Sequence, residues 1–241
     1  LEKYGVTVYR PSKIENYNQI FSRDIAFVID NIFIKANILS NRAREIEALQ
    51  YVIDQIHPQK VVTFPQEVHI EGGDVMPYGN YIFVGTYYGD DYSSYITART
   101  NMAAVTALQE LFPKKIVKPF NLKKSNTVAQ DNALHLDCCF QPLGHGRCII
   151  HKEGFLIEQE YQWLVDFFGP ENCFHIDKQE MYHMNSNIFS ISEDVIISEK
   201  NFTRLNSWLV DKGYTVEEVC YSEIAKQEGL LRCSTMPLMR D

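Results

Sequence analysis

The sequence has little of what marks membrane, nucleic-acid-binding or disulfide-rich proteins. No apolar run is long enough to cross a bilayer. The 23 basic residues are scattered and outnumbered by 31 acidic ones, for a formal net charge of −8. This balance argues against nucleic acid and favours a cationic ligand. The six cysteines form no C-x-x-C pair and have no regular spacing, which argues against a disulfide framework or a zinc ribbon and indicates a reducing cytoplasm.

The first residues also lack the marks of a targeting segment. Leu1 to Gly5 has neither a charged n-region nor an apolar h-region, and because the chain has no initiator Met we expect residues to precede Leu1. The composition, 45% hydrophobic and 22% charged, is ordinary for a folded globular protein. We therefore expect a cytoplasmic protein with a single domain over residues 1–241. We expect no nucleic-acid or membrane partner, and homo-oligomerisation is left open.

One pattern recurs four times along the chain: two β-type runs joined by a short turn, an amphipathic helix, and a third strand. The first two strands are predicted at 24–29 and 32–35, 73–78 and 81–84, 135 onward and 147–150, and 187–191 and 195–198. The helices are predicted at 42–56, 101–112, 158–168 and 202–212, and third strands at 60–64, 116–117 and 214–216. The turns Asp30-Asn31 and Gly79-Asn80 supply hairpin chemistry. Each repeat is therefore predicted to be a ββαβ module.

A polar or reactive residue stands at the start of each predicted first strand. These landmarks are Asp24, Glu71, His135, Asn187 and Cys233, at intervals of about 46 to 64 residues, a spacing typical of propeller-like arrays. If the modules form a ring, the starts of their first strands face the ring axis. We therefore expect landmarks that are far apart in the sequence to meet there.

The two chain ends each supply part of a module. Residues 6–9 are predicted to form only a last strand, and residues 231–240 only a first strand. Joined, they would make a fifth unit that closes a ring and leaves no module with an exposed apolar face. The fold class predicted is α/β: a five-bladed propeller of ββαβ modules with pseudo-fivefold symmetry, its fifth module shared by the chain ends.

Cys233, His135 and the carboxylates have the parts of a covalent catalyst. A cysteine nucleophile needs a histidine that the fold brings near it, and a carboxylate that orients the imidazole. Side chains two apart on a strand share a face, so we expect His135 and Asp137 to project into one pocket. We expect Arg232 or a protonated His135 to favour the thiolate. Glu71 belongs to an acidic turn, Glu71-Gly72-Gly73-Asp74, whose glycines allow close approach of another group.

Neither a metal nor another cofactor is expected. The run His-x-Asp-Cys-Cys that begins at His135 contains ligand-type atoms, but its spacing matches none of the usual zinc pairings. The remaining cysteines are interpreted as small apolar fillers: Cys138, Cys139, Cys148, Cys173 and Cys220. A thiol, an imidazole and several carboxylates without a metal suit attack on a guanidinium carbon, because the planar fork of five donors matches carboxylates placed on both sides.

The ordered set of motifs resembles the guanidino-group modifying enzymes of the pentein fold, which include arginine deiminase, dimethylarginine dimethylaminohydrolase and the amidinotransferases. The motifs span essentially the whole chain: Ser22-Arg23-Asp24, Glu71-Gly72-Gly73-Asp74, Ala98-Arg99-Thr100-Asn101, His135-Leu136-Asp137 and Arg232-Cys233-Ser234-Thr235-Met236-Pro237-Leu238. The resemblance implies the five-module propeller and a single catalytic domain. It also implies that the partner is a small cationic, arginine-like substrate.

The resemblance assigns a role to each candidate residue. For catalysis it implies Cys233 as nucleophile, His135 as general acid and base, and Glu71 as the partner that orients the imidazole. For binding it implies a guanidinium clamp of Asp24 and Asp137, an α-carboxylate contact from Arg99, and a supporting place for Asp74.

Three functions remain open from the sequence. The ending Arg-Cys-x-x-Met-Pro-Leu at Arg232 is similar to arginine deiminase, whereas residues 135–143 and 185–188 are closer to the amidinotransferases. We favour a C–N hydrolase that forms a covalent thiouronium-type intermediate. The first alternative is transfer of the amidino group to an amine. The second is a noncatalytic binding module, like the ribosome anti-association factor that resembles this fold.

Overall fold

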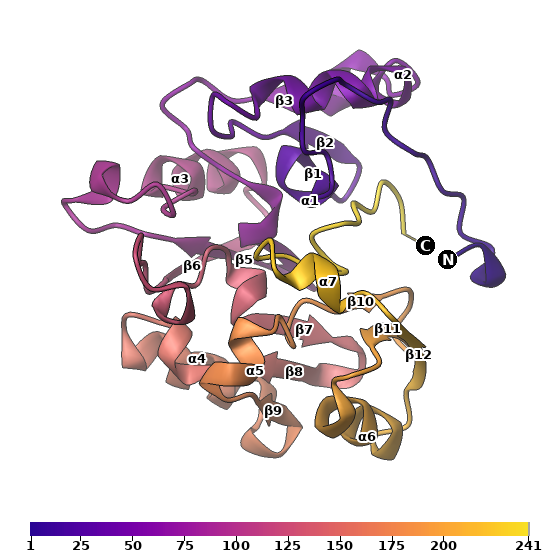
Figure 1. Ribbon diagram of the computed structural model, residues 1–241. Helices are drawn as coiled ribbons and strands as arrows, with labels where there is room; N and C mark the ends of the chain where they lie inside the picture. The colour runs from indigo at the N-terminus through magenta and orange to yellow at the C-terminus, as the bar shows by residue number, and fades with distance from the viewer. Residues whose placement is uncertain (241) are drawn as a thin grey trace.

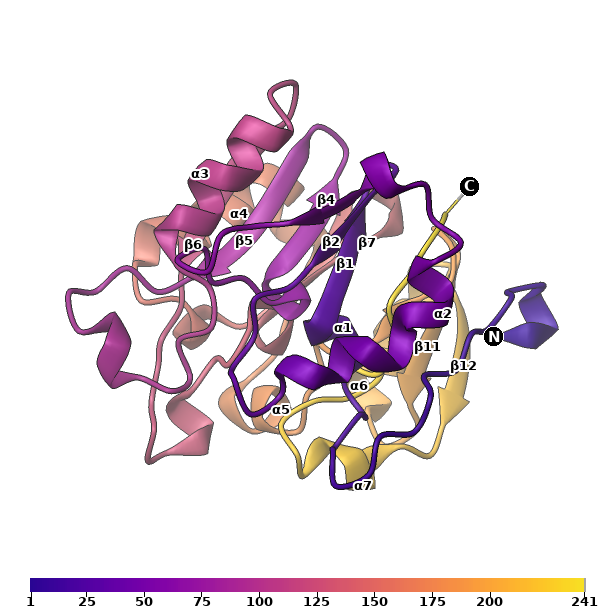
Figure 2. The same cartoon turned by 90° about the horizontal axis from the view of Figure 1, so that it is seen from above.

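Four sheets of three strands each surround a common centre in the computed structural model, which describes residues 1–240 (Figure 1). The strands are β1 (Ala26–Ile29), β2 (Ile32–Lys35), β3 (Val61–Thr63), β4 (Val75–Tyr78), β5 (Tyr81–Thr86), β6 (Ile116–Asn121), β7 (Phe140–Leu143), β8 (Arg147–Ile150), β9 (Cys173–His175), β10 (Phe189–Ser190), β11 (Val195–Glu199) and β12 (Thr215–Val219). The α-helices are α1 (Ser22–Ile25), α2 (Gln50–Ile53), α3 (Met102–Leu111), α4 (Glu158–Phe168), α5 (Lys178–Tyr182), α6 (Thr203–Asp211) and α7 (Ser222–Ala225). Helices α2, α3, α4 and α6 lie on the outside of the ring (Figures 1 and 2).

All four sheets share one topology. The second strand of each module is central, pairs antiparallel with the first strand, and pairs parallel with the third. An antiparallel pair needs only a tight turn, whereas the parallel pair needs a crossover, which the helical segment of each module supplies. The predicted ββαβ modules are therefore present. The first hairpin turns through Asp30 with φ 52°, and the second through Gly79 with φ 53°.

The landmark residues lie just before the first strands and not within them. Short 3₁₀ helices, Gly72–Asp74 and Leu136–Cys138, precede β4 and β7, and α1 precedes β1. The amide of Asp74 donates to the carbonyl of Glu71, and the amide of Cys138 donates to the carbonyl of His135. These turns place the landmarks at the inner ends of the modules. Because the landmarks lie in turns, their side chains do not alternate between two faces as they would on the predicted strands.

The first residues and the C-terminal segment lie on the same side of the ring, between the first and fourth sheets in the view of Figure 1. Lys3 and Tyr4 contact Glu217 of β12, and Arg240 donates to the carbonyls that end β10. Residues 6–9 and 231–240 are near the predicted fifth position, but neither segment forms a strand. At the start of the second segment the amides of residues 231 and 232 donate to the carbonyl of Asn187, that of Cys233 donates to the Asn187 side chain, and those of residues 234 and 235 close local turns. These five amides are therefore not available for a strand ladder.

A single apolar core joins the second, third and fourth modules. Phe83 of β5 is fully buried, and its ring packs against Phe120 and Phe140 with centroids 5.8 and 5.9 Å apart. Such edge-on aromatic pairs add to the stability gained from burial. These three modules are thus fixed relative to one another, and a second apolar cluster packs the first module against the second. In the part of the chain that the structure describes, no helix combines the length and the apolar character needed to span a membrane.

Candidate active site

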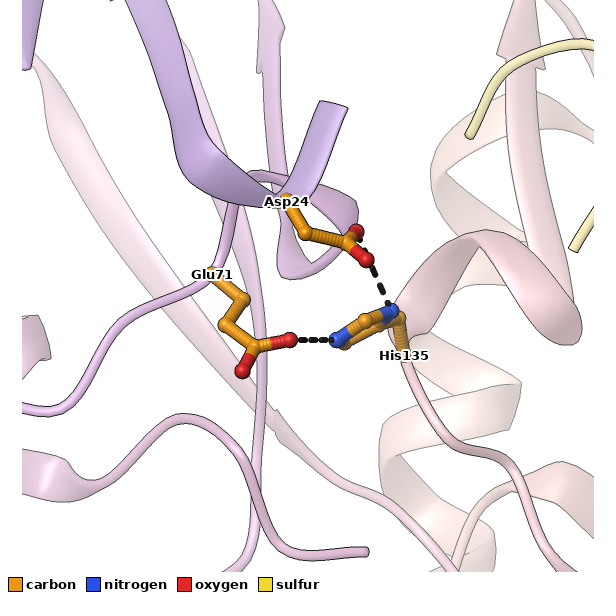
Figure 3. A group of neighbouring side chains, drawn as sticks. All are labelled: Asp24, Glu71 and His135. Carbon is orange, nitrogen blue, oxygen red and sulfur yellow. Dashed lines mark hydrogen bonds and ion pairs between the residues drawn. The ribbon is translucent and has the colours of Figure 1, made fainter. Parts of the chain in front are cut away.

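His135 lies between two buried carboxylates (Figure 3). Its Nε2 atom is 2.7 Å from Oε2 of Glu71, and its Nδ1 atom is 3.7 Å from Oδ1 of Asp24. No more than 3% of the surface of any of the three residues is exposed. Burial lowers the pKa of His135, but the surrounding carboxylates, Asp24 foremost, outweigh it and raise the pKa to about 9. The imidazole is therefore a cation at neutral pH and can donate a proton.

Arg99 supports Glu71 from the side opposite His135. Its Nη1 atom lies 3.2 Å from both carboxylate oxygens of Glu71, and its Nε atom donates to the carbonyl of Ile96. Burial raises the pKa of Glu71, but the hydrogen bond to His135 and the charge of Arg99 lower it to about 2. The Nη2 atom of Arg99 has no hydrogen-bond partner within residues 1–240 and is therefore available as a donor. The contact between Arg99 and a substrate carboxylate stays a prediction.

The two glycines of the acidic turn make room for the catalytic groups. A Cβ atom on Gly73 would lie 2.6 Å from Nδ1 of His135, and one on Gly72 would lie 2.2 Å from the carbonyl oxygen of Arg23. Both distances are far inside van der Waals contact. The imidazole can therefore rest directly against the backbone only because Gly73 lacks a side chain, and the absent side chain of Gly72 lets the turn approach the backbone of Arg23.

Asp74 fixes the segment that carries His135. One of its carboxylate oxygens accepts from the amide of Leu136 at 2.8 Å, and the other accepts from the hydroxyl of Thr100 at 2.7 Å. Burial raises the pKa of Asp74. Both oxygens are used within the protein, which favours the supporting place that the sequence suggested for Asp74.

Asp24 presents one oxygen to the site and one to an arginine. Its Oδ2 atom is 2.8 Å from Nη1 of Arg42, which also binds Glu45. Its Oδ1 atom is buried and has no hydrogen-bond partner among the described residues. Burial raises the pKa of Asp24. A buried carboxylate oxygen without a partner is costly, so it marks a place for a cationic group.

Asp137 and His135 do not lie on a strand, as the periodicity suggested, because residues 136–138 form a helical turn. The expectation that both side chains enter one pocket stays a prediction. Asp137 binds Arg232, with Oδ2 and Nη1 2.6 Å apart. Arg232 also donates to the carbonyls of Gly73 and Val75, so one buried guanidinium joins the second module, the third module and the C-terminal segment.

The Cys233 thiol lies beside Asp137. Its Sγ atom is 3.6 Å from Oδ2 of Asp137 and 3.1 Å from Nδ2 of Asn187, and only 2% of the residue is exposed. Burial raises the pKa of the thiol, and the negative charges of Asp137 and Asp24 raise it further. Within residues 1–240, His135 is not among the hydrogen-bond partners of this sulfur.

One expectation about cysteines needs correction and another stays a prediction. The guanidinium of Arg232 is held by Asp137 and by backbone carbonyls, and the expectation that its charge favours a Cys233 thiolate stays a prediction. Cys220 is exposed and therefore does not fill an apolar core, whereas Cys148 and Cys173 are buried as expected. Buried Cys138 and Cys139 likewise match the expectation.

The nitrogen and oxygen atoms of Asp24, Glu71 and His135 could in principle bind a metal, but their arrangement suits hydrogen bonding better. Asp24, Glu71 and His135 offer ligand-type atoms within 4.8 Å of one another. However, the two carboxylates face different nitrogens of the ring (Figure 3). An ion at one nitrogen would therefore lie away from the carboxylate at the other, and a three-ligand centre would need these side chains to move.

Two residues of the site were not among the sequence candidates. Asn187 contacts the thiol, and its place in the repeat was the signal that could have identified it. Arg42 binds Asp24 from the predicted helix at 42–56, which in the structure is a 3₁₀ helix over Ala43–Leu49 followed by α2. Nothing in the local sequence distinguishes this arginine from a surface one.

The curated relatives cover most of the chain at low identity. YkgA of Bacillus subtilis, an uncharacterized protein, is 29% identical over 224 residues, which are 92% of this chain and 70% of that protein. N(G),N(G)-dimethylarginine dimethylaminohydrolase of Pseudomonas aeruginosa is 24% identical over 196 residues, 81% of this chain and 66% of the enzyme, just under two thirds of its length. No protein-family profile matches the chain.

Solved structures share the fold. The N-terminal domain of ArgZ, an arginine dihydrolase of the cyanobacterial ornithine-ammonia cycle, matches in its product-bound form with a TM-score of 0.74 and 18% identity, covering 92% of this chain and 77% of that one. A form of this domain bound covalently to a reaction intermediate gives 0.76 at 18% identity, covering 91% of this chain and 75% of that one. Dimethylarginine dimethylaminohydrolase from Pseudomonas aeruginosa with citrulline gives 0.69 at 21% identity, covering 88% and 73%. The chain has the pentein fold of these proteins, and the resemblance is confirmed at that level.

Proposed function

We propose that the chain is a cysteine-dependent hydrolase acting on the guanidino or ureido carbon of an arginine-like small molecule. The observation that carries the proposal is the buried Oδ1 atom of Asp24, which accepts no hydrogen bond from residues 1–240 and lies 3.7 Å from Nδ1 of the His135 imidazole. A cationic, planar substrate would supply the missing donors. The named activities of the similar proteins, arginine dihydrolase and dimethylarginine dimethylaminohydrolase, support the same class.

The proposed clamp consists of one oxygen from each of two carboxylates. Asp24 and Asp137 each give Oδ2 to a resident arginine, Arg42 or Arg232. Among residues 1–240 this leaves Oδ1 of Asp24 without a hydrogen-bond donor, and Oδ1 of Asp137 with the Cys138 thiol alone, 3.8 Å away. A guanidinium can donate from opposite edges of its plane to both oxygens. The resident arginines hold the carboxylates in place while the substrate uses their free oxygens.

Binding of the substrate also prepares the nucleophile. The negative charges that raise the pKa of the Cys233 thiol belong to Asp137 and Asp24, which are the proposed clamp. A guanidinium bound between them cancels much of this effect, so the thiolate is stabilised when the substrate is present. Reactivity is thereby coupled to occupancy of the site.

The reaction then follows from the protonation state of His135. The thiolate of Cys233 adds to the guanidino carbon, and the resulting tetrahedral species loses its amine as the imidazolium donates a proton to the leaving nitrogen. This step leaves a thiouronium-type adduct on sulfur and a neutral imidazole. Glu71 holds the ring and stabilises its cationic form throughout.

Hydrolysis of the adduct reverses the proton transfer. Neutral His135 takes a proton from water as the water oxygen adds to the same carbon, and the sulfur of Cys233 then leaves. With arginine as substrate, water and the guanidinium give a ureido product and ammonium. If an amine takes the place of water, the same intermediate gives amidino transfer, which the experiment below distinguishes.

We further propose that the protein acts in the cytoplasm without a metal or organic cofactor, and that its partner is a small cationic substrate and neither a nucleic acid nor a membrane. Free thiols suit a reducing compartment. The catalytic-type residues are sealed from solvent, with His135 and Glu71 each 1% exposed. A covering segment must therefore move to admit the substrate.

The test combines substrate screening with two cysteine variants. The protein is incubated with arginine, methylated arginines, agmatine and citrulline, with and without glycine as acceptor, and ammonia, amine and urea are measured. We expect release without an acceptor, a covalent adduct at Cys233, and loss of both in Cys233→Ser but not in the exposed control Cys220→Ser. Reaction only with glycine would establish transfer, and intact substrates with no selective labelling of Cys233 by a haloacetamidine probe would favour a binding module.

A further inference from the structure

We infer that Asn187 is a further catalytic residue, whose side-chain amide holds the Cys233 sulfur and stabilises its thiolate. The Nδ2 atom of Asn187 lies 3.1 Å from Sγ of Cys233 and is the sole hydrogen-bond donor to that sulfur within residues 1–240. Asn187 is fully buried, so water cannot replace this donor without a rearrangement. The inference rests on the proposed role of Cys233 as nucleophile.

The orientation of the Asn187 amide is fixed by its oxygen. Oδ1 accepts from the backbone amides of Leu230 at 3.0 Å and Cys233 at 3.1 Å. An NH₂ group in that position would face two donors, so the oxygen must lie there and the NH₂ group must face the thiol. The donor role toward sulfur is therefore dictated by the backbone and does not depend on a free choice of rotamer.

The backbone of Asn187 also binds the turn formed by residues 230–233. Its carbonyl accepts from the amides of Leu231 and Arg232, both at 3.1 Å, and its own amide donates to the carbonyl of Met184. Together with the two bonds to Oδ1, these contacts engage the amide hydrogens of residues 230 to 233. The turn that carries the nucleophile is thus built on this one asparagine.

The neighbouring segment ties this turn to the proposed clamp. The Ser186 hydroxyl donates to the carbonyl of Asp137 at 2.8 Å, and Nδ2 of Asn187 is 3.5 Å from the same oxygen. The distance between the sulfur and the Asp137 carboxylate is therefore set by residues 186 and 187. A guanidinium held by Asp137 would meet a sulfur whose position is already fixed.

The charges around the sulfur make this donor necessary. The titratable and charged groups near it on the adjoining elements are Asp24 and Arg23 from α1, Asp137 and Cys138 from the turn before β7, and Arg232 from its own segment. Burial and the carboxylates oppose the thiolate, and Arg232 is engaged by Asp137. Hydrogen bonding to the charged form lowers the pKa of a thiol, and Asn187 supplies it directly.

Asn187→Asp is the sharpest substitution because it keeps the size and the accepting oxygen but replaces the donor with a second acceptor. The rate of Cys233 alkylation by iodoacetamide is measured across a pH series by mass spectrometry, with Cys220 in the same sample as an internal standard. We expect the midpoint for Cys233 to rise by about one unit or more, with alkylation near neutral pH slowed at least about tenfold. Asn187→Ala, which loses the donor outright, should shift the midpoint in the same direction.

Asn206→Asp is the matched control. Asn206 is a buried asparagine of α6 whose Nδ2 atom donates to the carbonyl of Glu199, so the substitution also places a carboxylate in the interior. We expect it to lower stability without moving the alkylation midpoint of Cys233. A wild-type midpoint in folded Asn187→Asp would overturn the inference.

A second measurement needs no substitution at position 187. In the wild-type protein the side-chain NH₂ resonances of Asn187 should shift with pH at the midpoint of Cys233 alkylation, and this shift should vanish in Cys233→Ser. If the NH₂ resonances of Asn187 do not shift as the Cys233 thiol ionises, the inference is also overturned. Both readouts are independent of turnover. If no guanidine is hydrolysed but the midpoints move, the proposed function fails alone, and if turnover is seen but neither readout responds, the role of Asn187 fails alone.

Discussion

The Nε2 atom of His135 and the Oε2 atom of Glu71 lie 2.7 Å apart, in residues that are each only 1% exposed. The two groups come from different modules and meet because each stands one turn before the first strand of its own module. Their pKa values move in opposite directions, to about 9 for His135 and about 2 for Glu71. The pair is therefore ionised across the physiological range, and this sets both the catalytic and the stability behaviour of the site.

Replacing Glu71 with Gln should reduce the fraction of His135 that is protonated at neutral pH. Loss of the adjacent negative charge is expected to lower the pKa of His135 by about one to three units. Less imidazolium is then present at neutral pH, and we expect amine release there to slow by up to about tenfold, with the alkaline limb of the rate profile moved to lower pH. Steady-state rates over a pH series, with the His135 resonances followed by NMR, provide the measurement. An unchanged limb would contradict the assignment of Glu71 as partner.

The same ion pair predicts a specific dependence of stability on pH. The pKa of His135 rises from 6.5 to about 9 on folding, so its stabilising contribution is fully present below about pH 6.5 and is lost as pH rises through about 9. The lowered pKa of Glu71 acts at the other end, with a contribution present above about 4.5 and lost as pH falls through about 2. Urea denaturation measures the free energy of unfolding across this pH range. On the alkaline side this free energy should fall more steeply in the wild type than in His135→Asn. Parallel dependences on pH in the two proteins would contradict the raised pKa of His135.

Gly73→Ala should impair chemistry far more than folding. The added Cβ would lie 2.6 Å from Nδ1 and 3.0 Å from Cβ of His135, so the imidazole must shift by a sizeable fraction of an ångström. Such a shift of a catalytic group costs about 100-fold in rate. Turnover and thermal unfolding are measured on the same sample, and we expect the folded protein to persist with little activity.

Gly79→Ala is the control for that substitution. A Cβ on Gly79 would meet no atom within 4 Å, but the residue has φ +53°, which is strained for alanine. We expect a loss of about 1 kcal/mol in the free energy of unfolding and an unchanged rate. If Gly73→Ala behaved like this control, the imidazole would not depend on the missing side chain at position 73.

The order of motifs and the repeat predicted much of this arrangement. Asp24, Glu71 and His135 were expected to converge because each begins a module, and they do lie together. The modules themselves follow from hydrophobic periodicity and turn residues, which are local properties of the sequence. Helix α4, for example, occupies the predicted residues 158–168 because its apolar spacing and its flanking residues agree.

Other features of the site depend on contacts between distant segments and have no local signal. Strand periodicity placed His135 and Asp137 on one strand, whereas residues 136–138 form a helical turn. Arg232 was expected to act on the thiol, but three carbonyl and carboxylate oxygens of other modules compete for its guanidinium. Asn187 was recognised as a landmark, yet only the three-dimensional arrangement shows its amide against Cys233.

Arg232→Gln should destabilise the protein strongly, because Arg232 joins the C-terminal segment to the second and third modules. The substitution leaves Asp137 buried without its partner at 2.6 Å, and removes the donors to the carbonyls of Gly73 and Val75. Breaking a buried ion pair by removing one member costs about 3–5 kcal/mol. The matched control is Arg44→Gln, whose exposed pair with Glu47 contributes little. Chemical denaturation measures both variants. Equal free energies of unfolding would show that the Arg232 contacts do not hold the modules together.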